Sequence, residues 1–231
     1  MSDKEASTSG IVATTTPVVQ AFPALTEARK FKSGGRESGE PKYSDSFVFD
    51  PASPDLQRLK AAAVAQAQAK WPGRDIGAEF KAGTFAMPFT SGNGIIAKTK
   101  AKAEAAGKEY DGKADFMKDK IIIKASSKYP PRLAYIENGK ISPVLEGPAL
   151  AANKNKFFFG AEVLFEVNLV AYDKVGERGV DGVTAYLNQV LTTGKGKRLS
   201  GGSDPADTFA GYAGKLSQED PTKDLDDEIP F

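Results

Sequence analysis

Hydrophobic and polar residues alternate along several segments of the chain, which is the pattern of half-buried β-strands. The alternation is clearest in residues 157–173, and residues 43–50 place Tyr, Asp, Phe and Phe at every second position. Asn138-Gly139 separates two further strand segments, 132–136 and 141–145, and this dipeptide is typical of a tight β-hairpin. Additional strands are expected at 83–89, 118–126 and 182–193. The last of these is compatible with a strand or a helix, and its Val, Thr and Tyr residues favour the strand.

Two segments have the features of a helix. Ser53 and Pro54 form a helix start, an Ala- and Gln-rich run extends to Lys70, and Trp71-Pro72-Gly73 ends it. Residues 94–107 combine Lys and Ala and predict a short, exposed, basic helix. With 23 glycines and 14 prolines in 231 residues, we expect long loops elsewhere. The sequence predicts a mainly β protein: a small antiparallel barrel with one or two helices.

The absence of cysteine and histidine excludes several kinds of chemistry. The chain has no residues for disulfides, thiolate zinc sites or nucleophile–base pairs of Cys or His. A metal site made of carboxylates alone remains possible, but nothing in the sequence resembles a nuclease motif, and we expect no enzyme activity and no cofactor. Residues 1–16 are polar without an apolar signal core, and no stretch approaches the roughly 18 apolar residues that a membrane span needs. A soluble intracellular protein without a membrane partner is expected.

Charge is distributed unevenly between the two ends of the chain. Residues 217–231 carry six acidic side chains and one lysine, a charge of −5, and the whole chain is +1, so the preceding residues carry +6. Such asymmetry indicates a body that contacts nucleic acid and an acidic tail that binds partners.

The final six residues combine acids with an apolar end. Three carboxylates attract a basic patch, Ile229 and Phe231 can fill an apolar pocket, and Pro230 limits the conformations lost on docking. The terminal carboxylate can meet an arginine. The candidate partner-binding residues are Asp226, Asp227, Glu228, Ile229, Pro230 and Phe231. The alternative is a solvated tail that only aids solubility, and the terminal Ile-Pro-Phe after the acids disfavours it.

This tip resembles the end of bacterial single-stranded-DNA-binding proteins, in which a near-identical sequence recruits replication and repair proteins. The body from Ala24 to Tyr212 resembles instead the phage-encoded single-stranded-DNA-binding proteins with an extended OB-fold. The matching motifs are Phe22-Pro23-Ala24-Leu25 with the basic residues after it, Pro41-Lys42-Tyr43, the helix ending at Trp71, Ala125-Ser126-Ser127 before Pro130-Pro131, Gly179-Val180, and residues 199–202 before Phe209. The Lys-Ala segment 95–106 has no counterpart in that pattern.

The sequence and the resemblance together predict three parts: a disordered arm (1–21), an OB-fold-like domain that binds single-stranded DNA (22–214) and the acidic tail (215–231). The resemblance implies sequence-independent binding and protection of single-stranded DNA in phage replication, recombination or repair, in the cytoplasm of the infected bacterial host. The implied partners are single-stranded DNA and, through the tail, replication or recombination proteins. A homodimer is compatible with the sequence.

Such proteins bind phosphates with basic side chains and stack bases on aromatic rings. The candidate DNA-binding residues are Tyr43, Phe85, Tyr129, Tyr135, Lys30, Lys42, Lys128, Arg132, Lys197 and Arg198. For each aromatic residue the alternative is core packing, and for each lysine it is a surface charge. The three tyrosines are favoured because tyrosine suits a half-exposed position and each lies near a base in the sequence.

Two other functions are compatible with the sequence. A metal-dependent nuclease would use a carboxylate cluster, with Asp45, Asp50 and Asp55 as its candidates. Proline-flanked turns and a helix cap explain the last two equally well. A protein scaffold would use the acidic tail alone and would not bind DNA at moderate salt.

Overall fold

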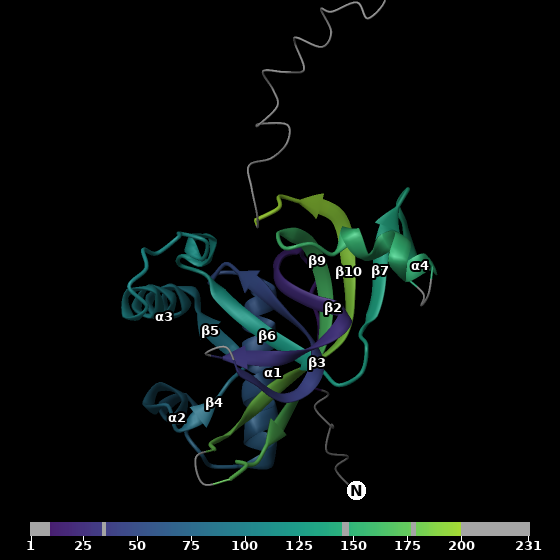
Figure 1. Cartoon of the computed structure of the whole chain (residues 1–231). Helices are drawn as coiled ribbons and strands as arrows, with labels where there is room; N and C mark the ends of the chain where they lie inside the picture. Colours follow the sequence, from purple (N-terminus) through teal and green to yellow (C-terminus); the bar gives the residue numbers. More distant parts are fainter. Residues whose placement is uncertain (1–9, 34–35, 145–147, 177–178, 200–231) are drawn as a thin grey trace, which may run out of the picture. The chain divides into compact units, whose positions relative to one another are not determined.

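The computed structural model describes residues 10–33, 36–144, 148–176 and 179–199 (Figure 1). The chain divides after Leu199 into two units, and every described residue belongs to the first. The predicted acidic tail therefore lies outside the described residues. In chain order the elements are β1 (Ile11–Ala13), β2 (Val18–Ser33), β3 (Arg36–Phe49), α1 (Pro54–Lys70), α2 (Ile76–Ala82), β4 (Phe85–Ala86), β5 (Phe89–Ser91), α3 (Gly92–Ala105), η1 (Asp115–Met117), β6 (Ile121–Ser127), β7 (Arg132–Glu137), β8 (Lys140–Val144), α4 (Pro148–Asn153), η2 (Lys154–Lys156), β9 (Ala161–Tyr172) and β10 (Asp181–Gly196).

Five of these strands close into a barrel. β2 pairs with β3, β3 with β6, β6 with β10, β10 with β9, and β9 returns to β2 through the pair Val18–Val163. All pairs of the ring are antiparallel except β6–β10, which is parallel. This strand order with one parallel pair is the arrangement of an OB-fold. The expected mainly β, OB-fold-like barrel is confirmed.

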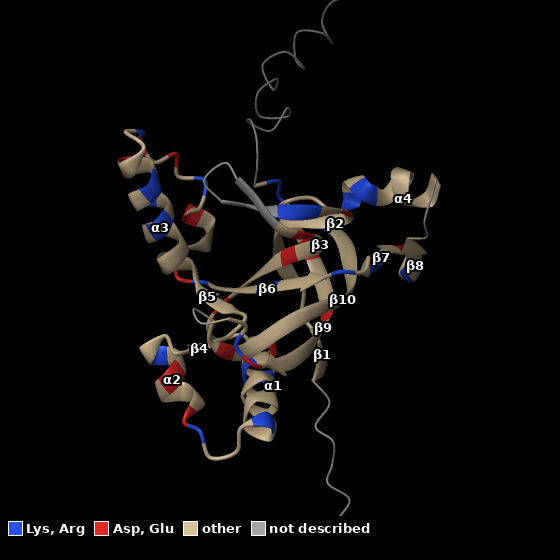
Figure 2. Cartoon of the chain, turned by 60° about the horizontal axis from the view of Figure 1, so that its bottom comes forward, with Lys and Arg blue, Asp and Glu red and all other residues tan. Residues whose placement is uncertain are grey.

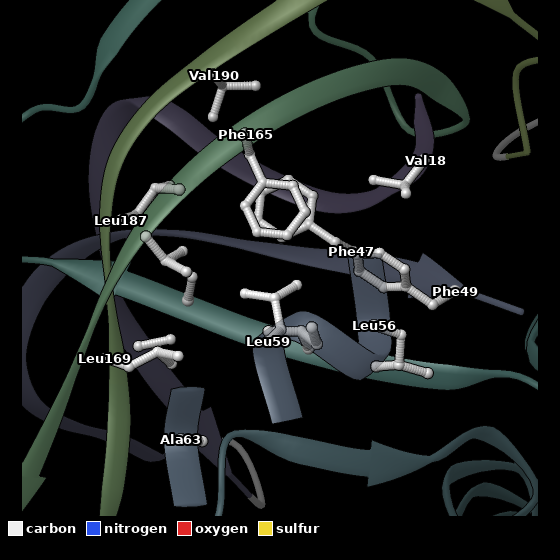
Figure 3. Close-up of a cluster of buried hydrophobic side chains, with 14 of the residues drawn as sticks. Val18, Phe47, Phe49, Leu56, Leu59, Ala63, Phe165, Leu169, Leu187 and Val190 are labelled. Carbon is white, nitrogen blue, oxygen red and sulfur yellow. The ribbon is translucent and has the colours of Figure 1, made fainter. Parts of the chain in front are cut away.

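Aromatic and aliphatic side chains fill the interior of the barrel (Figure 3). The rings of Phe47 on β3 and Phe165 on β9 stack with centroids 3.7 Å apart. Leu56, Leu59 and Ala63 of α1 reach into the same cluster. The helix therefore covers part of the barrel core with one apolar stripe.

Local sequence signals place α1 and the β7–β8 hairpin where the sequence predicts them. The hydroxyl of Ser53 accepts a hydrogen bond from the N–H of Leu56, Pro54 is the first helical residue, and the helix ends before Trp71. In the hairpin, Asn138 and Gly139 both have positive φ, 50° and 73°, as a tight turn of this type requires. β7 pairs with β10 outside the barrel ring, so the hairpin extends the sheet beyond the barrel.

The remaining predictions are partly confirmed. β6, β9 and β10 match their predicted segments, and the segment around Pro88 forms two short strands, β4 and β5. The Lys-Ala segment lies in α3. α2 and α4 were not predicted, so the described chain has more than the one or two helices expected. No helix in the described ranges combines the length and apolar character needed to cross a membrane.

The prediction that residues 1–21 form a disordered arm is wrong for the described part of that segment. β1 pairs with β9, and β2 begins at Val18. Val18, Gln20 and Ala21 are all buried. From the sequence alone, the Ser- and Thr-rich residues before this short apolar run indicate disorder. The strand becomes recognisable only when its pairing with β9 is known.

Candidate nucleic-acid interface

A hollow of about 630 Å³, called here the basic hollow, lies on the outer face of β2, β3 and β6. Asp45 and Phe47 of β3 point into the barrel, so Lys42 and Ser44, which alternate with them, point outward. The register of β2 and β3 places Arg29 directly opposite Lys42. The lining consists of Phe22, Ala24, Arg29, Lys30, Gly39, Glu40, Lys42, Ser44, Ser126 and Lys128. Three predicted phosphate partners, Lys30, Lys42 and Lys128, therefore lie in one hollow.

The cations of this hollow are not balanced within its lining. Arg29 and Lys42 are like charges directly opposite each other, an arrangement that destabilises a sheet. Glu40 is the acid of the lining, and its carboxylate pairs with the Lys128 ammonium at 2.6 Å. The hydrogen bond between them lowers the pKa of Glu40 and raises the pKa of Lys128. Because Glu40 is matched with Lys128, the other three cations leave the hollow positive, as a site for phosphates requires.

Tyr43 and Arg132 lie in a second hollow of about 750 Å³, called here the tyrosine hollow. It is lined by Leu25, Thr26, Tyr43, Pro130, Pro131, Arg132, Leu133, Pro143, Val144 and Leu150. Tyr43 shares the side of β3 on which Asp45 and Phe47 lie, whereas its neighbour Lys42 faces the basic hollow. The structure thus separates Tyr43 from Lys42 and joins it to Arg132.

The other two predicted tyrosines differ in how much of their rings is accessible. Tyr129 follows β6 and is 78% exposed, so most of its side chain is accessible to a ligand. Tyr135 on β7 is half-buried, and the ammonium of Lys156 lies 3.4 Å from its ring centroid. One face of Tyr135 is therefore already occupied by a cation.

Phe85 is part of the core and not of a surface site. It is 2% exposed, and its ring meets Trp71 edge to face with centroids 5.5 Å apart. The guanidinium of Arg74 lies 5.5 Å from its centroid. The prediction that Phe85 stacks on a base is therefore wrong, because its ring is buried. The segment around it is apolar because it packs into the core.

Lys197 and Arg198 lie after β10, where the segment is held against residues 158–160. The N–H of Leu199 donates to the carbonyl of Phe159 at 3.0 Å. Gly160 has φ +102°, and a Cβ at this position would lie 1.8 Å from the Lys197 carbonyl oxygen. This close approach places the Arg198 guanidinium 4.7 Å from the centroid of the Phe158 ring. Both predicted residues are exposed.

Arg198 belongs to a third hollow of about 390 Å³, called here the aromatic hollow. It is lined by Phe22, Pro23, Arg29, Lys154, Asn155, Phe157, Phe158, Phe159 and Arg198. Phe22 and Arg29 also line the basic hollow, so the two hollows meet at these residues. Figure 2 shows the corresponding basic positions on β2, beside α4 and after β10 in the upper part of that view.

Sequence reasoning missed Phe22, Phe158 and Phe159 as site residues. A run of phenylalanines usually marks a core, and Phe157 of the same run is indeed buried. The available signal was the position of Phe22 a few residues before a basic cluster, combined with the proline that follows it.

The three aspartates of the nuclease interpretation do not converge. Asp45 is 1% exposed inside the barrel, and burial raises its pKa. Asp50 pairs with Lys120 at the surface, and Asp55 accepts hydrogen bonds from Thr15. In the part of the chain that the structure describes, no group of three or more acidic side chains is placed to hold a metal ion.

The sequence matches the family model of the single-stranded-DNA-binding protein of Enterobacter phage Enc34 over residues 12–223. The chain belongs to this family. The structure of the Enc34 protein in complex with single-stranded DNA has a TM-score of 0.55 at 16% identity, over 83% of this chain and 90% of that one. A second structure of the Enc34 protein gives 0.54 at 14% identity, over 87% and 90%. No curated protein matches the sequence. At these identities the structural likeness supports the shared fold, and the resemblance to phage single-stranded-DNA-binding proteins is confirmed.

Proposed function

We propose that the chain binds single-stranded DNA without sequence preference, along the basic hollow and the aromatic hollow. The observation that carries this proposal is the pair Arg29–Lys42, two like charges held opposite each other on β2 and β3 in the lining of the basic hollow. Repulsion between them favours a polyanionic ligand. Membership of the Enc34 family and that protein's structure with single-stranded DNA support the same ligand.

The chemistry of the lining fits binding without base readout. Basic side chains contact phosphates, which every sequence has, and aromatic rings stack on bases, each of which has a π-face. Stacking contributes about 1–3 kcal/mol per base, and a single OB-fold occupies about 4–16 nucleotides. Coating of this kind would protect a single strand during phage replication, recombination or repair in the host cytoplasm.

The acidic tail is the proposed site for partner proteins. Its support is the sequence of residues 226–231, in which three acids precede an apolar terminus. Replication or recombination proteins with a basic rim around an apolar pocket are the partners that this tip fits. A homodimer of the DNA-binding domain is compatible with this proposal and is tested by measuring mass in solution.

Fluorescence anisotropy of labelled oligo-dT and of a duplex of equal length, each across a salt series, tests the proposal. We expect preference for the single strand and a logarithmic salt slope of about −0.7 per phosphate neutralised. Absence of binding to either form at moderate salt would favour the scaffold interpretation. Divalent-ion-dependent loss of the labelled strand would favour the nuclease.

A further inference from the structure

Phe22 is an exposed aromatic residue in an unusual backbone conformation. Its φ is +59°, it precedes Pro23, and 57% of the residue is exposed. A non-glycine residue rarely adopts this region, and it persists where the surroundings hold it or where function requires it. Packing into the core does not explain the position, because the side chain lies largely in solvent.

The neighbours of Phe22 brace one face of its ring. Phe159 stacks on it with centroids 4.9 Å apart and an interplanar angle of 27°. Phe159 is in turn held edge-on by Phe116, with centroids 5.2 Å apart. The ring is therefore supported directly by Phe159, which Phe116 holds in place in turn. Such a fixed ring loses little conformational freedom when it stacks on a ligand.

Phe22 also stands where the two hollows meet. On one side lie Arg198 and Phe158 of the aromatic hollow, and on the other lie Lys30 and Lys42 of the basic hollow. Arg29 lines both hollows, as Phe22 does. A DNA strand that follows the cations from one hollow to the other must pass this ring.

We propose that Phe22 is the residue that makes binding selective for single-stranded over double-stranded DNA, by stacking on an unpaired base at the junction of the two hollows. This inference rests on the proposed function. Phosphates are present in both forms of DNA, so the cations attract both. The faces of bases are accessible only where the strand is unpaired, so stacking on the Phe22 ring stabilises only the complex with single-stranded DNA.

Two substitutions at Phe22 and one at Arg29 separate the role of the ring from the role of the charge. Phe22→Leu removes the aromatic face but keeps an apolar side chain, and Phe22→Trp keeps an aromatic face. Arg29→Gln removes a cation of the same junction. Phe80→Leu on α2 is the matched control, because Phe80 is also an exposed phenylalanine and lines none of the three hollows. Thermal unfolding of each variant checks its fold.

The measurement is the affinity of each variant for oligo-dT and for the equal-length duplex across a salt series. We expect Phe22→Leu to weaken single-strand binding about 5-fold to 100-fold, with duplex affinity and salt slope unchanged. Phe22→Trp should keep the preference, and Phe80→Leu should behave as the unmodified chain. Arg29→Gln should weaken both forms and reduce the single-strand slope by about 0.7.

The outcomes that overturn the inference differ from those that overturn the proposed function. If the unmodified chain binds oligo-dT and Phe22→Leu binds it equally well, or loses both forms of DNA equally while remaining folded, Phe22 is not the selective residue. If the unmodified chain binds neither form, the proposed function fails and the inference fails with it. Fluorescence of 2-aminopurine placed in the oligonucleotide adds a direct readout, because stacking on the ring should quench it with the unmodified chain and with the Phe22→Trp variant, and not with the Phe22→Leu variant.

Discussion

The carboxylate of Asp55 on α1 accepts a hydrogen bond from the backbone N–H of Thr15, with 2.8 Å between N and Oδ2. The N–H of Thr16 donates to the same oxygen at 2.9 Å, and Asp55 is only 2% exposed. Two backbone N–H groups before β2 thus donate hydrogen bonds to the same buried carboxylate. This contact ties the segment between β1 and β2 to α1, which explains why it follows the barrel and does not form a disordered arm.

Asp55→Asn should destabilise the fold, and the effect should depend on pH. Burial raises the pKa of Asp55, but the hydrogen bonds from Thr15 and Thr16 outweigh burial and leave the pKa lowered. A lowered pKa in the folded state gives stability that is present above the unfolded value of about 3.9 and lost as the pH falls through the folded value. We expect a loss of about 2–3 kcal/mol at pH 7. Urea unfolding at pH 7 and pH 3 measures the loss in free energy of unfolding. An equal loss at both pH values would show that the effect does not depend on the charge of Asp55.

Asp45→Asn should have the opposite effect. The side chain is 1% exposed inside the barrel, its Oδ2 has no hydrogen-bond partner, and burial raises its pKa. A raised pKa means that stability is full below the unfolded value and is lost as the pH rises toward the folded value. The neutral amide removes this cost, so we expect a gain of about 1–3 kcal/mol at pH 7 and little change at pH 3. Destabilisation at pH 7 would show that the carboxylate has a structural role.

Lys42→Gln should weaken DNA binding while making the folded protein slightly more stable. Removing Lys42 relieves its repulsion with Arg29, worth about 0.2–1 kcal/mol across a strand pair. The same change should reduce the salt slope for oligo-dT by about 0.7. Lys81→Gln on α2 is the matched control, because Lys81 is exposed outside the three hollows. Loss of both stability and affinity would argue against an electrostatic cause.

Gly160→Ala should displace the basic segment after β10. A Cβ at Gly160 would meet the Lys197 carbonyl oxygen at 1.8 Å, whereas at Gly139 it would meet nothing within 4 Å. Both glycines have positive φ, so Gly139→Ala reports the cost of backbone strain alone, about 1 kcal/mol. We expect Gly160→Ala to lose at least about 2 kcal/mol more and to weaken DNA binding. Equal effects of the two substitutions would show that the close approach is unimportant.

Deleting residues 224–231 should leave affinity for oligo-dT equal or higher, because the deletion removes negative charge, which opposes the binding of a polyanion. The same deletion should abolish pull-down of replication or recombination proteins from the host. A variant that keeps the acids but replaces Ile229 and Phe231 with serine separates charge from apolar docking. Weaker DNA binding by the deletion variant would contradict the proposed role of the tail.

Elements with local signals could be predicted from the sequence. Ser53, Pro54 and Trp71 mark the two ends of α1, and strict alternation identifies the buried face of β9. β1 and the start of β2 could not be predicted, because their stability comes from pairing with β9, far away in the sequence.

The candidate site was predicted in part for a similar reason. The sequence predicts three of the basic residues, because lysine side chains are usually exposed. The folded sheet then places Lys30, Lys42 and Lys128 together in the basic hollow. Tyr43 was grouped with Lys42 on sequence distance alone, although neighbours in a strand face opposite sides. Phe22 is exposed and Phe85 is buried, and only the tertiary structure distinguishes these two phenylalanines.

The pair Val18–Val163 that closes the barrel also constrains when the protein acquires its binding surface. β2, β3 and β6, which carry the basic hollow, are synthesised well before β9 and β10. Until those two strands emerge from the ribosome, the inner faces of the first three, with Phe47 and Ile123, can pack against α1 but lack the side chains of β9 and β10 that complete the core. Barrel closure between residues so far apart is intrinsically slow. A nascent chain therefore acquires its DNA-binding surface only after almost the whole domain has been translated.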